Sequence, residues 1–224
     1  MKDGAEKVPS KADEAKKDAE ALDAAMKKAD LADSFSKIMG STLAEEEGDK
    51  LNVKEMYGTC LLLLIAGHET TTRLIGNGMF TLFNYLEQMN HLQNNFELIP
   101  NAIEEMLRYE PPVHATVRFA ENEMIYGEET YKRGTAFAIS IAGANRDPEA
   151  NENPNEFNIT REDIKHISFG YGPHMCIGAS LARIESRIAF EVLFDRYPRM
   201  ALMEKNPIWG KNLIFRGFNN LKIR

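Results

Sequence analysis

The feature that most constrains this chain is a cysteine inside a glycine-rich decapeptide, residues 169–178, which reads F-G-Y-G-P-H-M-C-I-G. Glycine and proline at this density predict a tight, irregular loop. Apolar residues at mostly helical spacing follow and predict a helix from Ala179 to Arg196. Cys176 is therefore expected just ahead of a helix N-terminus, which favours negative charge, so that its thiolate could ligate a metal. Taken alone, such a cysteine could instead be a small buried apolar side chain.

Composition limits the class of protein. The chain has 224 residues, 43% of them hydrophobic, which is enough for one domain with a substantial core. Its net charge of -7 argues against a nucleic-acid partner. It has only two cysteines, Cys60 and Cys176, which excludes a disulfide scaffold and favours the reducing cytoplasm. The longest apolar run, residues 60–66, is far shorter than the roughly 20 residues of a membrane span, and no signal peptide is expected.

The chain divides by composition into two parts. Residues 1–30 contain seven lysines, eight acidic residues and eight alanines, which predicts a charged, solvated tail or helix. A docking tail is the alternative. A helical apolar stripe begins at Leu31, and residues 31–224 are expected to form the folded domain.

A long helix is predicted from Val53 to about Leu86. Asn52 can cap it, with Glu55 three residues further on, as in a capping box. Because residues 60–66 are apolar on all sides, this helix is expected to cross the core. A short helix from about Glu87 to Asn94 is predicted to follow.

A polar break interrupts the long helix at residues 66–72, A-G-H-E-T-T-T. Glycine and a run of β-branched threonines are unfavourable inside a helix, so the break indicates a function. The alternative is local: a threonine hydroxyl can bond the carbonyl four residues earlier and merely bend the helix.

Another helix is predicted to open at Pro100 and to end before Pro111. It places Glu105 and Arg108 on one face, three residues apart. An exposed ion pair of little energetic value is the alternative for these two residues.

Short β-prone segments between residues 115 and 141 predict a small antiparallel sheet. Near the C-terminus, residues 213–215 and 221–223 predict a hairpin around Gly217 and the pair Asn219-Asn220.

The decapeptide resembles the haem-thiolate loop of the cytochrome P-450 superfamily, F-x-x-G-x-x-x-C-x-G. Three more family motifs occur in family order: A-G-x-E-T-T at residues 66–71, E-x-x-R at residues 105–108, and a second arginine at Arg161. The resemblance covers about residues 31–224. It implies a mainly α fold with small antiparallel β-sheets, namely the C-terminal haem-binding part of that fold with the N-terminal part missing.

The resemblance also implies roles for individual residues. It implies haem b as cofactor, with Cys176 as the proximal iron ligand, and Glu69 and Thr70 as a proton relay to bound oxygen. Glu105, Arg108 and Arg161 would form a structural cluster behind the cysteine loop. The other residues implied in binding the cofactor are Phe169, Gly170, Gly178, Ala66, Gly67, Arg118 and His174. Without the resemblance, Arg118 would be read as a surface residue and His174 as a loop residue.

By resemblance, the chain is expected to be a haem-dependent monooxygenase that inserts one atom of O2 into a small organic substrate. Electrons would come from a ferredoxin or flavodoxin with its reductase, with no membrane and no nucleic acid involved. The residues within these motifs are similar to those of soluble bacterial family members of the secondary-metabolism type. Family members are usually nearly twice this long, so the alternative is a truncated, non-catalytic haem-binding remnant. A different enzyme class finds no support, since the zinc, Walker, Rossmann and G-x-S-x-G patterns are missing from the sequence.

Overall fold

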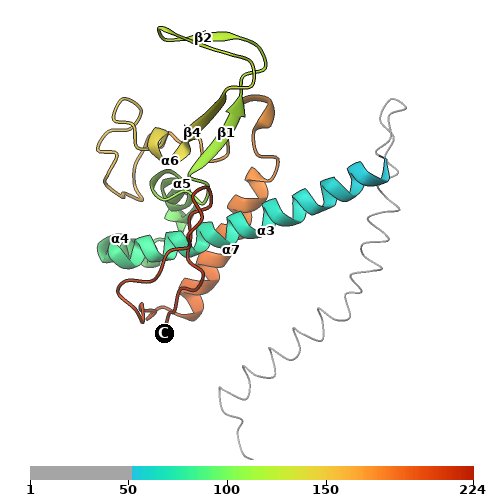
Figure 1. The fold of residues 1–224 in the computed structure, drawn as a ribbon. Helices are drawn as coiled ribbons and strands as arrows, with labels where there is room; N and C mark the ends of the chain where they lie inside the picture. Colours follow the sequence, from blue (N-terminus) through green and yellow to red (C-terminus); the bar gives the residue numbers. More distant parts are fainter. Residues whose placement is uncertain (1–51) are drawn as a thin grey trace, which may run out of the picture. The chain divides into compact units, whose positions relative to one another are not determined.

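A computed structural model describes residues 52–224 of the chain (Figure 1). The chain divides into two compact units, Met1–Leu62 and Leu63–Arg224. Of the first unit, only residues 52–62 are described, so the expected tail over residues 1–30 and the apolar stripe that starts at Leu31 lie outside the described residues. The tertiary contacts reported below all lie within the second unit.

Helix α3 spans Val53–Asn84 and begins as the sequence predicts. The Asn52 side chain accepts hydrogen bonds from the main-chain N–H groups of Lys54 and Glu55, at 3.0 and 3.1 Å. The Glu55 carboxylate in turn accepts from the N–H of Asn52 at 2.8 Å. This reciprocal pair satisfies N–H groups that a helix start leaves without partners, so the predicted capping box is confirmed.

Three short helical elements follow α3. Helix α4 spans Leu86–Asn94, a 3-10 turn η1 spans Phe96–Leu98, and α5 spans Ile99–Tyr109. Pro100 lies in the first turn of α5, and the helix ends two residues before Pro111, both as predicted. None of the helices in the described part of the chain has the length and apolar character needed to cross a membrane.

The β-prone region forms two separate two-stranded antiparallel sheets (Figure 1). Strand β1 (Ala115–Phe119) pairs with β4 (Ala136–Ser140), with Ala115 opposite Ser140 and Phe119 opposite Ala136. Strand β2 (Met124–Tyr126) pairs with β3 (Glu129–Tyr131) and lies between them in the sequence. The strands therefore form one hairpin inside another, instead of the single sheet that was expected.

The last regular elements are helix α6 (Ile141–Ala144), the 3-10 turn η2 (Gly172–His174) and helix α7 (Ala179–Arg196). The bounds of α7 agree with the prediction. The long stretch between α6 and η2 has no regular helix or strand and winds past α5.

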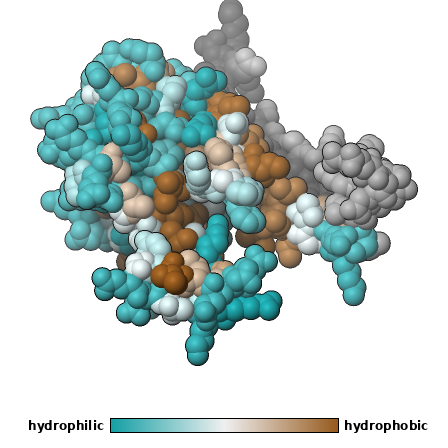
Figure 2. All heavy atoms as spheres, turned by 90° about the horizontal axis from the view of Figure 1, so that it is seen from above, coloured by the Kyte–Doolittle hydropathy of each residue, from teal (hydrophilic) through white to brown (hydrophobic). Residues whose placement is uncertain are grey.

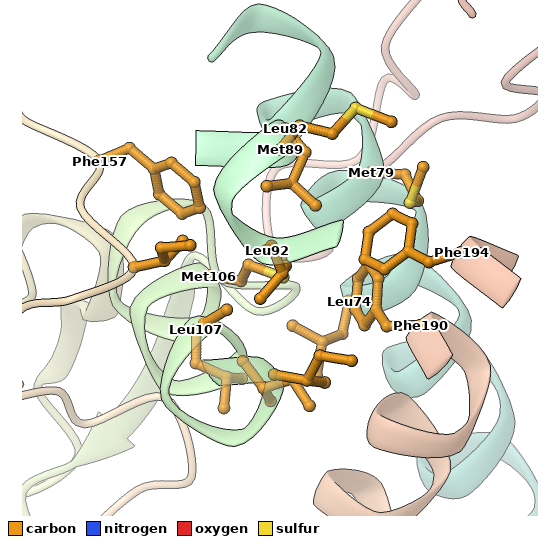
Figure 3. Packing of buried hydrophobic residues seen from close by; sticks show 14 residues of the cluster. Leu74, Met79, Leu82, Met89, Leu92, Met106, Leu107, Phe157, Phe190 and Phe194 are labelled. Carbon is orange, nitrogen blue, oxygen red and sulfur yellow. The ribbon is translucent and has the colours of Figure 1, made fainter. Parts of the chain in front are cut away.

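The core forms where α3, α5 and α7 meet (Figure 3). A Cβ atom on Gly78 of α3 would lie 2.5 Å from the Met106 sulfur and 2.9 Å from Phe190, so only glycine permits this close approach. The side chains that share this core include Leu74, Met79, Leu82, Leu92, Met106, Leu107, Phe157, Phe190 and Phe194.

The apolar run of α3 does not cross this core, contrary to the prediction. Leu63, Leu64 and Ile65 in the second unit remain 56%, 67% and 50% exposed. The core instead uses Leu74, Met79 and Leu82, about two to five turns further along α3, because α5 and α7 pack at Gly78. Apolarity all round a helix predicts burial but cannot say which partner supplies it.

The predicted C-terminal hairpin is also wrong in its pairing. Phe215 bridges Val113 and Ile223 bridges Leu202, so the two predicted strands do not pair with each other. Trp209 instead pairs with Phe218, and their rings stack 3.8 Å apart. Local β-propensity identified extended segments, whereas contacts distant in sequence determined their partners.

Candidate functional site

The cysteine loop has the tight turns that its glycines predict. Gly170 and Gly172 adopt φ angles of 74° and 71°, a region that favours glycine. The main-chain N–H of Cys176 donates to the carbonyl of Phe169 at 2.8 Å and closes the loop. The thiol is exposed, and α7 begins three residues later at Ala179.

Large apolar side chains around this cysteine face solvent. Tyr171 and Ile177 are 90% and 93% exposed, and Met175 is 57% exposed. Figure 2 shows apolar side chains gathered across the middle of one face, with polar residues around them. Exposed apolar groups next to a potential metal ligand mark a surface suited to a flat, apolar ligand.

The polar break in α3 remains helical. The Thr70 hydroxyl donates to the carbonyl of Ala66 at 2.6 Å, and the Thr72 hydroxyl donates to that of His68 at 2.8 Å. The local alternative for these threonines is therefore present in the structure. Gly67 has open space where a Cβ atom would stand, with no heavy atom within 4 Å.

Glu69 bonds a residue that the sequence analysis did not single out. Its carboxylate accepts from Arg73 Nη2 at 2.6 Å and from Arg73 Nε at 3.1 Å, one turn further along α3. Neighbouring residues on a helix do not face each other, so Glu69 and Thr70 point in different directions. The carboxylate is 39% exposed and remains accessible to water.

Glu105, Arg108 and Arg161 come together in one cluster. Glu105 and Arg108 are completely buried and form two parallel hydrogen bonds of 2.7 Å. Arg161 Nε lies 3.3 Å from the same carboxylate, and the N–H of Asn158 donates to it at 2.9 Å. The guanidinium of Arg108 also donates to the carbonyl groups of Pro154 and Glu156. The cluster thus ties α5 to the irregular stretch that precedes the cysteine.

Two further groups support the loop and were not recognised in the sequence. Buried Asn145 donates to the Ser168 hydroxyl at 2.8 Å, and its side-chain oxygen accepts from the N–H of Ile167 at 2.9 Å. The Ser168 hydroxyl donates to the carbonyl of Leu107 in α5 at 2.6 Å. No sequence signal singles out Asn145, because its burial depends on the tertiary fold.

Glu104 joins three elements in a second charged cluster. Arg183 of α7 donates to both of its oxygens, at 2.6 and 2.8 Å, and His166 lies 3.0 Å away, just before the loop. Burial alone would raise the pKa of Glu104, but the hydrogen bonds from Arg183 and His166 outweigh burial and lower it from 4.5 to about 2.

The depressed pKa of Glu104 predicts an acid-sensitive contribution to stability. Because the folded state holds the carboxylate ionised, this contribution is present above pH 4.5 and is lost as the pH falls toward 2. We expect Glu104→Gln to be less stable than the parent at about pH 7, with the difference shrinking at about pH 3. Urea unfolding at both pH values measures this, and a constant difference would contradict the assignment.

The two expected carboxylate donors are exposed. Arg118 Nη1 donates to Thr116 and to the carbonyl of Val117 within its own strand, at 3.0 Å each. His174 lies in η2, two residues before Cys176. Haem requires a ligand for its iron, apolar groups beside its ring and basic groups for its propionates. The exposed Cys176 thiol, its exposed apolar neighbours and the two basic side chains provide these, and the glycines allow the tight turns of the loop. The residues present therefore fit that cofactor.

The chain is similar to a large set of bacterial proteins. The family model described as Cytochrome P450 matches residues 7–211. The polyketide biosynthesis cytochrome P450 PksS of Bacillus subtilis is 42% identical over 183 residues, which are 80% of this chain and 45% of PksS. The cytochrome P450 monooxygenase PikC of Streptomyces venezuelae is 40% identical over 185 residues, which cover 81% of this chain and 44% of PikC.

Solved structures give the same result. The PksS structure matches with a TM-score of 0.79 at 38% identity, over 87% of this chain and 54% of that one. The structure of P450BioI in complex with an acyl carrier protein matches with a TM-score of 0.76 at 40% identity, over 81% of this chain and 47% of that one. The predicted fold class, helical with small antiparallel sheets, is confirmed. The chain spans about half the length of the relatives it matches.

Proposed function

Because this chain belongs to the cytochrome P450 family, we propose that it carries the haem-thiolate centre of a monooxygenase that inserts one oxygen atom from O2 into a small organic substrate. The observation that carries this proposal is the loop around Cys176. Its thiol is exposed between two left-handed glycines and the start of α7, among exposed apolar side chains.

In this proposal, the chain's own residues bind and orient haem b. The Cys176 sulfur would ligate the iron, and Gly170 and Gly178 would keep the loop free of side chains that hinder binding. Arg118 and His174 would donate charge-assisted hydrogen bonds to the propionate groups. When bound, the haem would supply reductive activation of O2, which a cysteine thiolate ligand favours by donating electron density to the iron. Phe169 orients the ligand, because its carbonyl accepts the N–H of Cys176.

Residues of the polar break in α3 would hold and transfer protons. The Thr70 hydroxyl donates its hydrogen to the carbonyl of Ala66, so the lone pairs of the hydroxyl oxygen are available to hold a water molecule. Glu69, half-exposed and oriented by Arg73, can pass protons between bulk water and that site. Gly67 leaves the adjacent space open.

The carbon-monoxide spectrum of the reduced, haem-supplemented chain tests the proposal. A red-shifted, thiolate-type Soret band would support it, together with product formation when a ferredoxin or flavodoxin system supplies electrons. The alternative, a non-catalytic haem-binding remnant, rests on the exposure of Leu63, Leu64 and Ile65, which shows that this part of α3 is in contact with water. A stable thiolate band without any turnover would favour that alternative, and a spectrum without the band would contradict the haem-thiolate proposal itself.

Thr70→Ala should uncouple turnover while leaving haem binding intact. A side chain positioned to assist proton transfer contributes about 10²–10⁴-fold in rate, so we expect product per electron to fall at least about tenfold and hydrogen peroxide to rise. Thr72→Ala is the matched control, because Thr72 makes the same bond to the carbonyl four residues earlier. Equal effects of the two substitutions would show that only helix geometry is involved.

A further inference from the structure

Arg183 occupies a distinctive place beside the cysteine loop. It lies in the first turns of α7, and its Nε and Nη2 atoms donate to the two oxygens of Glu104 in α5. Two parallel hydrogen bonds fix the plane of a guanidinium as well as its position. Glu104 Oε2 also lies 3.0 Å from His166 Nε2, so two other parts of the chain fix the orientation of Arg183.

The guanidinium plane fixed in this way covers the first residue of the loop. The Arg183 Cζ atom lies 4.5 Å from the centre of the Phe169 ring, a distance at which a cation interacts favourably with an aromatic face. The carbonyl of Phe169 accepts the main-chain N–H of Cys176 at 2.8 Å. A continuous set of contacts therefore leads from Glu104 through Arg183 and Phe169 to the cysteine.

We propose that Arg183 is a positioning residue for the cysteine ligand, acting through its stacking on Phe169. This inference rests on the proposed function only in naming Cys176 as the ligand. The geometry requires the flat, five-donor guanidinium, because a lysine could pair with Glu104 but could not stack in the same plane.

The charge on Arg183 supports this role. Its pKa is raised first by the hydrogen bond to Glu104; burial opposes this shift, while the charges of Glu104 and Cys176 add to it. The ion pair with Glu104 keeps Arg183 charged, as the cation–π contact with Phe169 requires.

Hydrogen exchange of the full chain without haem tests the positioning directly. We expect the Cys176 amide in Arg183→Gln to exchange roughly tenfold faster than in the parent, because a charged hydrogen bond and a cation–π contact are both lost. Arg187→Gln is the control, since Arg187 lies one turn further along α7, pairs with Glu191 at 3.7 Å and is half exposed. Unchanged exchange in Arg183→Gln, or equal acceleration in both variants, would overturn the proposal.

Two further measurements separate this inference from the proposed function. In the haem-loaded chain, Arg183→Gln should convert from the thiolate-type to the non-thiolate Soret band faster than Arg187→Gln, a change that general loosening of the helix would not produce selectively. Arg183→Lys should recover only part of the amide protection, and full recovery would overturn the stacking role. If the parent shows no Cys176-dependent haem band, the proposed function fails, and the exchange measurement still decides whether Arg183 positions the loop.

Discussion

Replacing Glu105 by alanine should lower the free energy of unfolding by about 3–5 kcal/mol. Glu105 and Arg108 are both fully buried, and the substitution would leave the Arg108 cation without its carboxylate in a site that water does not reach. The carbonyl groups of Pro154 and Glu156 would still accept hydrogen bonds from Arg108, but they carry no compensating charge. Urea unfolding at neutral pH, followed by far-UV circular dichroism, measures the loss.

Glu87→Ala is the control for this prediction. Glu87 is an exposed acidic residue in the first turn of α4, and its removal should change stability by no more than about 0.5 kcal/mol. Similar unfolding midpoints for the two variants would mean that the Glu105 cluster contributes no more than a surface pair. Asn158 and Arg161 also lose a partner in Glu105→Ala, so the irregular stretch before the loop should loosen first.

Replacing Cys176 by alanine should remove the thiolate-type Soret band completely. Iron in this site would lose its only proposed protein ligand, and among the described residues no group of three or more His, Cys, Asp or Glu side chains is placed to hold a metal instead. The fold should persist, because the Cys176 thiol is exposed and its main-chain hydrogen bond to Phe169 does not need the sulfur. The carbon-monoxide spectrum and the unfolding curve of the same sample measure both outcomes.

Cys60→Ser is the matched control, since Cys60 is the second free thiol and lies in the first turns of α3. It should keep the band. If Cys60→Ser lost the band and Cys176→Ala kept it, the assignment of the ligand would be reversed.

Features that depend on neighbouring residues could be predicted from the sequence. The capping box at Asn52, the ends of α5 at its prolines and the bounds of α7 follow from local backbone chemistry, which a few adjacent residues control. The cysteine loop was predictable for the same reason, because Gly170 and Gly172 permit turns that other residues resist. The motifs at residues 66–71 and 105–108 also carried the family assignment.

Which of these segments meet depends on the folding of the whole chain. The tertiary structure packs Asn145 against the irregular stretch before the loop and joins Glu104 to Arg183 across two helices. It also leaves Leu63, Leu64 and Ile65 exposed and gives Phe215 and Ile223 partners far away in the sequence. Propensity and periodicity report what one segment prefers, whereas burial and ion pairing depend on a second segment that the local sequence does not name.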